Sequence, residues 1–312
     1  MGLNVIITQI LMLAIAMLIG FLAVKLKYLD ASVAPSISKV IVRITLPLLI
    51  ISTVTTQNLS ANLLKNAGLL IILELLVFVV LYSVSALIAK LFRLKGATKT
   101  MHRLMGTFGN VIFLGYPLIT AIYGEIGLFY AVIYALVNDG FVWTMGVYFI
   151  CRDGAKSSGK SAVKSLINPN TVSFIIALLM LAFGIRLPEV LQKSFSAIGS
   201  LTTYLSMLFI GITLTQVDLK KLYKRVSIFA LTLIKMLLVP LALILILRLL
   251  PLDRVMCGAL ILQAAMPGQI ALAILASEYG SDTCYASECV FITTVLGLLL
   301  LPLCYYMILI LF

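Results

Sequence analysis

Apolar residues run through this chain in long blocks, and short polar segments separate each block from the next. The blocks cover residues 5–24, 37–56, 67–91, 103–122, 127–150, 168–186, 197–216, 226–249, 255–276 and 285–311. An α-helix needs about 20 residues to cross the hydrocarbon core of a bilayer, and each block approaches or exceeds that length. The pattern therefore predicts an all-α integral membrane protein with ten transmembrane helices.

Composition strengthens this interpretation, because 62% of the residues are hydrophobic and only 11% are charged. A soluble domain carries roughly a quarter charged residues. So few charges cannot cover a water-facing surface of this size. Lipid is therefore expected to replace water around most of the protein.

A net charge of +12 could indicate a protein that binds nucleic acid. The Lys and Arg residues lie instead in short clusters between apolar blocks. If the N-terminus is outside, 17 of the 23 fall on the cytoplasmic side of the ten crossings. The positive-inside rule then predicts a multi-pass protein of the plasma (cell inner) membrane, with both termini extracytoplasmic and no nucleic-acid partner.

The chain divides into two similar halves. Residues 1–150 form a first five-helix repeat and 167–312 a second, joined by a cytoplasmic linker at 151–166 that is rich in Ser, Gly and Lys. AIYGEIG at 121–127 corresponds to ASEYGSD at 276–282. Because five crossings is an odd number, the two repeats must insert in opposite directions. Inverted repeats are typical of secondary transporters.

The fourth and ninth blocks carry residues that interrupt helices. They hold Gly109, Asn110, Gly115 and Pro117 in the fourth block, and Gln263, Pro267, Gly268 and Gln269 in the ninth. Proline removes a backbone donor, and glycine weakens a helix. Unwound backbone is tolerated in a membrane only inside protein or beside a water-filled cavity. Two crossing broken helices would direct half-helix N-termini at one point, which suits an anionic substrate.

Four ionisable residues lie within apolar blocks, namely Glu74, Asp139, Lys235 and Glu288. Each costs about 2.5–3.5 kcal/mol on insertion scales, so each is expected to face the interior or a partner. Glu74 is the candidate for a coupling-ion or proton site, and Lys235 either shares that role or pairs with Glu74 structurally. Asp139, beside Asn138, is a candidate to line the cavity. Glu288 is either buried or interfacial.

Other chemistry has little support in the sequence. His102 is expected to be a solvated side chain in a basic cytoplasmic segment, and none of the five cysteines forms a CxxC pair. The sequence contains no HExxH, GxSxG or P-loop motif. We therefore expect no enzymatic activity, no cofactor and no metal site.

Several motifs resemble those of one known family. The segment GNVIFLGYPLITAIYGEIGL at 109–128, followed by Trp143, resembles the auxin efflux carrier family. That family includes bacterial malonate- and malate-type permeases and plant auxin carriers. NPNT at 168–171 and AMPGQIALAILASEYG at 265–280 are similar to further motifs of the family. The resemblance covers nearly the whole chain and indicates a prokaryotic member.

The resemblance implies a fold similar to those of sodium/proton antiporters and bile-acid symporters. Helices 1, 2, 6 and 7 would form a scaffold domain that usually makes a homodimer. Helices 3–5 and 8–10 would form a transport domain with elevator-like alternating access, and helices 4 and 9 would cross at the substrate.

Motif positions of the family fall on Asn110, Pro117, Pro267, Gln269 and Glu74. The family's glutamine before the fifth-helix Trp is Asp139 here, which would place a negative charge beside an anion site. The second proline of its ninth helix is Leu272, so that half of the crossover is expected to be less broken.

These observations predict a secondary carrier of a small organic anion, such as a mono- or dicarboxylate, embedded in the lipid bilayer. The expected substrate-binding residues are Asn110, Gly115, Pro117, Asn138, Asp139, Pro267, Gly268 and Gln269. Coupling to H+ or Na+ stays open. The alternative is a sodium- or proton-linked cation exchanger of the same fold, with Glu74 and Asp139 as its paired carboxylates. A channel or receptor is disfavoured because the sequence has no filter motif and no large soluble domain.

Overall fold

The computed structural model describes residues 3–56, 61–153, 169–215 and 225–312. These residues form helices, and no β-strand occurs among them apart from one isolated bridge. The described chain is therefore all-α, as predicted. Most of the expected linker at 151–166 lies outside the described residues, as does Asn168 of the NPNT motif.

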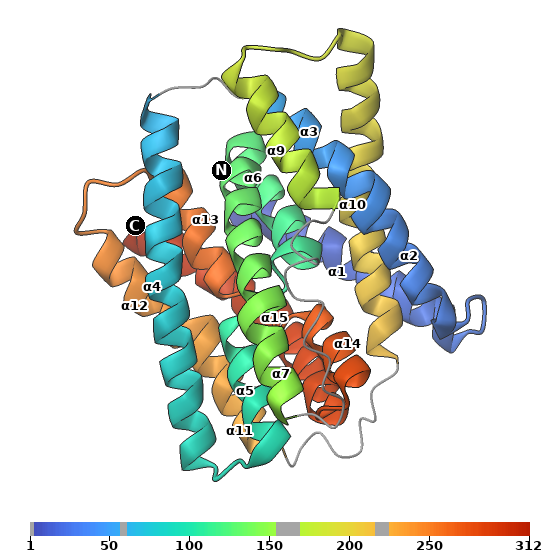
Figure 1. Cartoon of the computed structure of the whole chain (residues 1–312), viewed down its shortest axis with the longest axis vertical. Helices are drawn as coiled ribbons and strands as arrows, with labels where there is room; N and C mark the ends of the chain where they lie inside the picture. The colour runs from blue at the N-terminus through green and yellow to red at the C-terminus, as the bar shows by residue number, and fades with distance from the viewer. Residues whose placement is uncertain (1–2, 57–60, 154–168, 216–224) are drawn as a thin grey trace. The chain divides into compact units, whose positions relative to one another are not determined.

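Figure 1 labels the helices along the chain. They are α1 (Leu3–Lys25), α2 (Ala34–Val40), α3 (Leu46–Thr55), α4 (Ala61–Leu91), α5 (Gly96–Thr107), α6 (Tyr116–Phe141), α7 (Val147–Asp153), α9 (Pro169–Ala182), α10 (Glu189–Leu214), α11 (Val226–Leu233), α12 (Val239–Leu247), α13 (Arg254–Ala264), α14 (Ile270–Tyr279) and α15 (Thr283–Leu311).

Within the described residues, six helical stretches are long and apolar enough to cross a membrane. They are Ala31–Thr55, Asn62–Leu91, Val111–Asp153, Glu189–Leu214, Val226–Leu247 and Thr283–Leu311. Shorter apolar helices cover Leu11–Lys25, Val172–Ala182 and Arg254–Ala264. The protein is thus a helical membrane protein with several spans, whereas the ten crossings and the inverted relation of the halves stay predictions.

The stretch Val111–Asp153 joins what the sequence pattern separated into two blocks. A kink at Gly124 divides it, because φ there is +64° and ψ is −153°. Gly280, which ends α14, also has a positive φ of +70°. L side chains rarely adopt this conformation, so glycine is needed at both places. Each of the two glycines directly follows a tyrosine, in AIYGEIG and in ASEYGSD.

The chain forms two compact units. Unit 1 comprises Met1–Gly68, Ile112–Ile133 and Ile167–Gln216, and unit 2 comprises Leu69–Val111, Tyr134–Leu166 and Val217–Phe312. Each unit therefore combines segments from both halves of the sequence.

Unit 1 is centred on α10, which packs against α1 and α3, while α3 also packs against α9. The crossing of α1 with α10 is close because both helices present glycine. A Cβ added to Gly211 would lie 1.9 Å from the carbonyl oxygen of Met17, and one added to Gly20 would lie 2.4 Å from that of Leu208. Small residues that let backbones approach are a main source of helix association in membranes.

Polar side chains add interhelical hydrogen bonds inside unit 1. Thr202 of α10 donates from Oγ1 to Oγ1 of Thr45 at 2.8 Å. Gln192, also on α10, donates from Nε2 to the carbonyl of Ser52 at 2.9 Å. In a membrane each such bond contributes about 0.6–2 kcal/mol. These bonds fix α10 against the segment that contains α2 and α3.

Unit 2 is built around α15, the longest helix of its second half. It packs against α5, α11, α12 and α14, and Figure 1 shows α5, α11 and α14 gathered near it. The helices α5, α13 and α14 are only 12, 11 and 10 residues long. They are pieces of the predicted fourth and ninth spans, which the structure interrupts.

Widened helical turns precede three of the prolines. Five-residue π-helical turns cover Ile41–Thr45, Val111–Gly115 and Ile234–Leu238. Pro47, Pro117 and Pro240 each follow within two residues. Proline lacks an N–H and its ring crowds the carbonyl one turn earlier, and a π turn relieves that clash.

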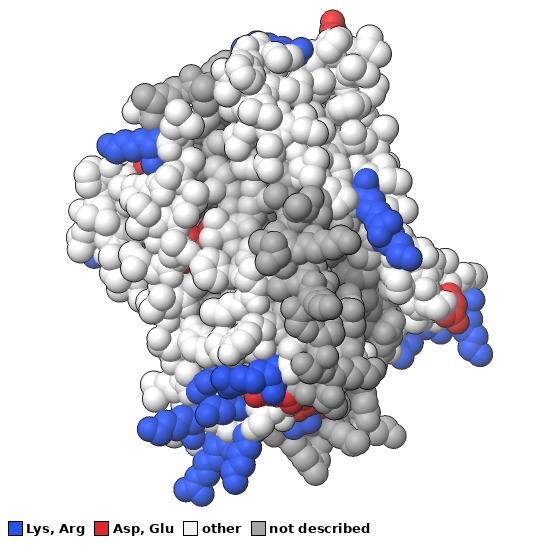
Figure 2. Space-filling view, in the orientation of Figure 1, with Lys and Arg blue, Asp and Glu red and all other residues white. Residues whose placement is uncertain are grey.

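The surface carries little charge. Figure 2 shows mostly uncharged side chains, with Lys and Arg in separate small groups. On α4, Leu76 and Val79 are 59% and 64% exposed. Large apolar side chains this exposed along a spanning helix are expected to contact lipid.

Candidate functional site

The predicted breaks in the fourth and ninth spans meet within unit 2. Helix α5 ends at Thr107, and Phe108 is extended with φ −94° and ψ 138°. Helix α13 ends at Ala264, and α14 does not begin until Ile270. The two interruptions pair as an antiparallel bridge between Gly109 and Gly268.

Backbone atoms hold this crossover together. The N–H of Asn110 donates to the carbonyl of Pro267 at 2.7 Å. A Cβ added to Gly109 would lie 2.9 Å from Cβ of Met266. The close approach explains the glycine, because any side chain there would push the two segments apart.

A side chain from α15 supplies a hydrogen-bond acceptor at the second interruption, between α13 and α14. The N–H of Gly268 donates to Oγ1 of Thr293 at 2.9 Å, and the hydroxyl of Thr293 donates to the carbonyl of Cys289 at 2.6 Å. Breaking a helix leaves backbone N–H groups without intrahelical partners. Thr293 supplies one of the replacements, a role that the sequence analysis missed.

Lys235 stabilises the end of α5. Its ammonium donates to the carbonyls of Met105 and Phe108 at 3.1 and 3.0 Å, and the side chain is buried. A cation at a helix C-terminus opposes the partial negative charge of the unpaired carbonyls. The alternative that Lys235 pairs structurally with Glu74 is wrong, because the ammonium binds backbone oxygens instead.

Glu74 lies on α4 and is fully buried. Neither of its carboxyl oxygens has a hydrogen-bond partner among the described residues. One turn further along α4, the Phe78 ring contacts Phe108 at 5.4 Å and Tyr134 at 5.9 Å between ring centroids. An aromatic cluster therefore connects the Glu74 face of α4 with the break after α5. The sequence held one signal for this connection, because a spacing of four residues places Phe78 on the same face of α4 as Glu74.

Three of the predicted site residues form one polar cluster. Asn138 donates from Nδ2 to Oε1 of Gln269 at 3.3 Å and to Oδ1 of Asp139 at 3.4 Å. Gln269 in turn donates from Nε2 to Oδ1 of Asp139 at 3.2 Å. The cluster links the last turn of α6 with the residue that precedes α14.

Gln269 occupies the N-cap position of α14 but does not cap it with its side chain. The first N–H groups of a helix lack intrahelical acceptors and carry about half a positive charge. Because the amide of Gln269 is engaged with Asn138 and Asp139, it leaves that helix end without a side-chain cap. Helix α14 continues without a break through Leu272. This is the position where the family's ninth-helix motif has its second proline, so the helix is less broken there, as expected.

Several buried polar atoms near the interruptions lack partners among the described residues. They are Nδ2 of Asn110, Oδ1 of Asn138 and Oε1 of Gln263. The other end of the Gln263 amide donates to the carbonyl of Val111 at 3.4 Å. An unsatisfied buried group costs about 1–3 kcal/mol. Such groups indicate a place where water or a ligand completes the hydrogen bonding.

The remaining predicted residues lie elsewhere. Gly115 ends a π-helical turn and Pro117 opens α6, and both belong to unit 1. Glu288 is buried and its Oε2 lies 2.6 Å from Nε of Arg225, so its partner is a cation at the start of α11.

The expectation for His102 is wrong. The side chain is fully buried on α5, and its Nδ1 lies 2.7 Å from the hydroxyl of Tyr285.

A bundle of apolar helices with two interrupted helices crossing in one unit is an arrangement typical of secondary transporters. Comparison with known proteins gives the same class. The chain matches the family described as membrane transport protein over residues 5–161 and 155–305. It belongs to that family, the auxin efflux carrier family that its motifs indicated.

Its relatives are distant in sequence, and their names describe them as transporters. An uncharacterized transporter of Methanocaldococcus jannaschii, MJ1031, is 24% identical over 301 residues, which cover 94% of this chain and 96% of the relative. The uncharacterized transporter YfdV of Escherichia coli K12 is 23% identical over 283 residues, 88% of each chain. An uncharacterized transporter of Methanothermobacter thermautotrophicus is 23% identical over 299 residues, 94% of this chain and 95% of the relative.

Proposed function

We propose that this protein is a secondary carrier of a small organic anion, a mono- or dicarboxylate, that binds at the crossover. The observation that carries the proposal is the N-terminus of α14, left without a side-chain cap next to an interruption whose Asn110 amide is buried and unpartnered among the described residues. Helix N-terminal N–H groups and amide donors are the groups that a carboxylate accepts from.

Asp139 constrains how an anion binds. An ionised Asp139 beside a substrate carboxylate would place two like charges in a poorly hydrated site. Sharing a proton between the two carboxyls removes that repulsion. The proposal therefore favours uptake of a proton together with the anion. Glu74, whose oxygens lack partners among the described residues, also requires a proton or a cation to offset its burial.

Alternating access in this proposal is elevator-like. The crossover, the cluster of Asn138, Asp139 and Gln269, and Glu74 all belong to unit 2. A site contained in one compact unit can move as a body, and we assign unit 2 the role of transport domain. Unit 1 is assigned the scaffold role and the surface for a homodimer.

Uptake into proteoliposomes tests the site assignment. Asn110→Ala should lower uptake of radiolabelled malonate or malate at least tenfold, because a hydrogen bond to a charged group contributes about 1.5–3 kcal/mol. Asn62→Ala, at an exposed position of α4, serves as the matched control and should transport as wild type. Normal uptake by the Asn110→Ala protein would contradict the assignment.

A cation exchanger of the same fold is the second candidate. It is favoured by one observation, that unit 2 holds two carboxyls within its spanning helices, Glu74 on α4 and Asp139 on α6. In the anion carrier protons move only together with the organic anion, whereas in the exchanger a sodium gradient alone moves protons. Proteoliposomes given a sodium gradient without organic anion should show no internal pH change if the anion carrier is correct. A pH change under those conditions would favour the exchanger.

A further inference from the structure

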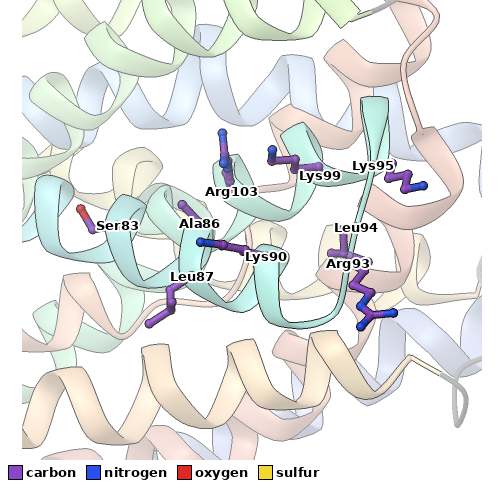
Figure 3. Close-up of a pocket in the computed structure, with 9 residues that line it drawn as sticks. All are labelled: Ser83, Ala86, Leu87, Lys90, Arg93, Leu94, Lys95, Lys99 and Arg103. Carbon is purple, nitrogen blue, oxygen red and sulfur yellow. The ribbon is translucent and has the colours of Figure 1, made fainter.

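A basic groove lies where α4 ends and α5 begins, apart from the crossover. Its volume is about 560 Å³ and its lining includes Lys90, Arg93, Lys95, Lys99 and Arg103. Figure 3 shows these side chains on the end of α4, on the connecting turn and on the first two turns of α5. Figure 2 shows Lys and Arg gathered at the same end of α4. None of the described residues that line the groove is acidic.

The five cations have no acidic partner among the ion pairs of the described residues. Two acids contact α5 through threonines and not through these cations, because Thr98 donates to Asp282 and Thr100 donates to Asp153. Arg103 stacks on the Tyr82 ring at 5.7 Å, and its buried Nε has no hydrogen-bond acceptor among the described residues. A group of cations held together in this way calls for an anionic ligand.

The connecting turn ends α4 with one basic residue, Arg93, in the left-handed conformation. Arg93 has a φ of +54°, which non-glycine residues rarely adopt. The turn is closed by the N–H of Leu94 donating to the carbonyl of Ala89 at 2.9 Å. Lys27 after α1 has a similar φ and the same type of closing bond, so this is an ordinary helix-ending turn, and it places Arg93 just beyond the last turn of α4.

The floor of the groove indicates which kind of anion fits. Ser83, Ala86 and Leu87 line it, and they belong to the apolar spanning part of α4. Ser83 lies roughly 10 Å along the helix from Lys90, toward the middle of that span. Leu87 is 67% exposed. The groove therefore joins a basic mouth to an exposed apolar wall, which matches an amphiphile better than a soluble ion.

We propose that this groove binds the headgroup of an anionic phospholipid. Lys90, Lys99 and Arg103 hold the phosphodiester, and the acyl chains lie along Leu87. The positive-inside distribution places this end of α4 at the cytoplasmic leaflet, where basic residues beside spanning helices attract anionic lipid.

Binding of fluorescent phosphatidylglycerol to purified protein in neutral detergent tests the proposal. Each basic residue removed should weaken binding about fivefold, so Lys90→Gln with Lys99→Gln should weaken it about 25-fold. The control pair, Lys25→Gln with Lys27→Gln, removes the same charge from exposed positions on the same predicted side of the membrane and should change binding less than twofold. Lys90→Arg with Lys99→Arg should bind as wild type.

Two results would overturn the proposal. Equal losses in the groove pair and the control pair would mean that the lipid responds only to total charge. Equal affinity of the wild type for glycerol 3-phosphate and for phosphatidylglycerol would mean that the groove takes a soluble phosphate. Since the assay measures lipid binding and not transport, its outcome does not depend on the proposed carrier activity.

Discussion

Thr293 and Thr294 are neighbouring buried residues of α15 with opposite hydrogen-bonding states. Oγ1 of Thr293 accepts from the N–H of Gly268 at the crossover. Oγ1 of Thr294 is buried and has no partner among the described residues. The same substitution, threonine to the nearly isosteric valine, therefore removes a working hydrogen bond at one position and an unsatisfied hydroxyl at the next.

The expected change in the free energy of unfolding depends on which buried polar groups each substitution leaves without a partner. Thr293→Val leaves the Gly268 N–H buried and unpaired, which should lower the free energy of unfolding by about 1–3 kcal/mol. The carbonyl of Cys289 loses a second donor but stays within the α15 ladder, so its contribution is small. Thr294→Val should be neutral or stabilise the protein by up to about 1 kcal/mol, because it removes a desolvated hydroxyl.

Unfolding in detergent can be followed with a thiol-reactive fluorogenic dye, since Cys257, Cys289 and Cys304 are buried. Thr293→Ser, which keeps the hydroxyl, should unfold close to wild type. Equal destabilisation by Thr293→Val and Thr294→Val would refute the reasoning, because it would assign the effect to side-chain shape and not to the Gly268 bond.

Two further substitutions test the packing of unit 1 and the coupling proposal. Gly211→Ala should destabilise the protein by about 1–3 kcal/mol in the same dye assay, because the new methyl would overlap the Met17 carbonyl, whereas Gly68→Ala, with open space around it, should be neutral. Glu74→Gln should unfold no earlier than wild type, since the carboxyl loses no partner among the described residues, but it should weaken the dependence of uptake on an imposed pH gradient and leave only the part that Asp139 carries. Uptake by Glu74→Gln that rises with the gradient as steeply as in the wild type would exclude Glu74 as a coupling residue.

The helical class and the two interruptions could be predicted because both depend on local chemistry. Twenty-residue apolar blocks have few alternatives to spanning helices, and glycine and proline interrupt a helix wherever they stand. The position of the first break was harder to predict. It falls at Phe108, Gly109 and Asn110, well before Pro117, because the tight approach to Met266 and not the proline decides where α5 ends.

The partners at the site could not be predicted in the same way. Lys235 binds carbonyls of α5, and every residue has a carbonyl, so no side chain in the sequence marks the acceptor. Thr293 is needed only because a distant helix breaks at Gly268. His102 was misplaced since its basic neighbours suggested solvent, whereas its own face of α5 is buried against Tyr285.

The bridge between Gly109 and Gly268 also has a consequence for synthesis. About half of the chain separates the two residues, so a ribosome adding roughly 5–20 residues per second needs on the order of ten seconds to deliver the second after the first. During that interval the carbonyls that Lys235 later binds and the N–H of Asn110 have no permanent partners, and hydrocarbon cannot supply them. The nascent fourth span must therefore be kept by the insertion machinery, or near the headgroups, until the rest of the chain arrives.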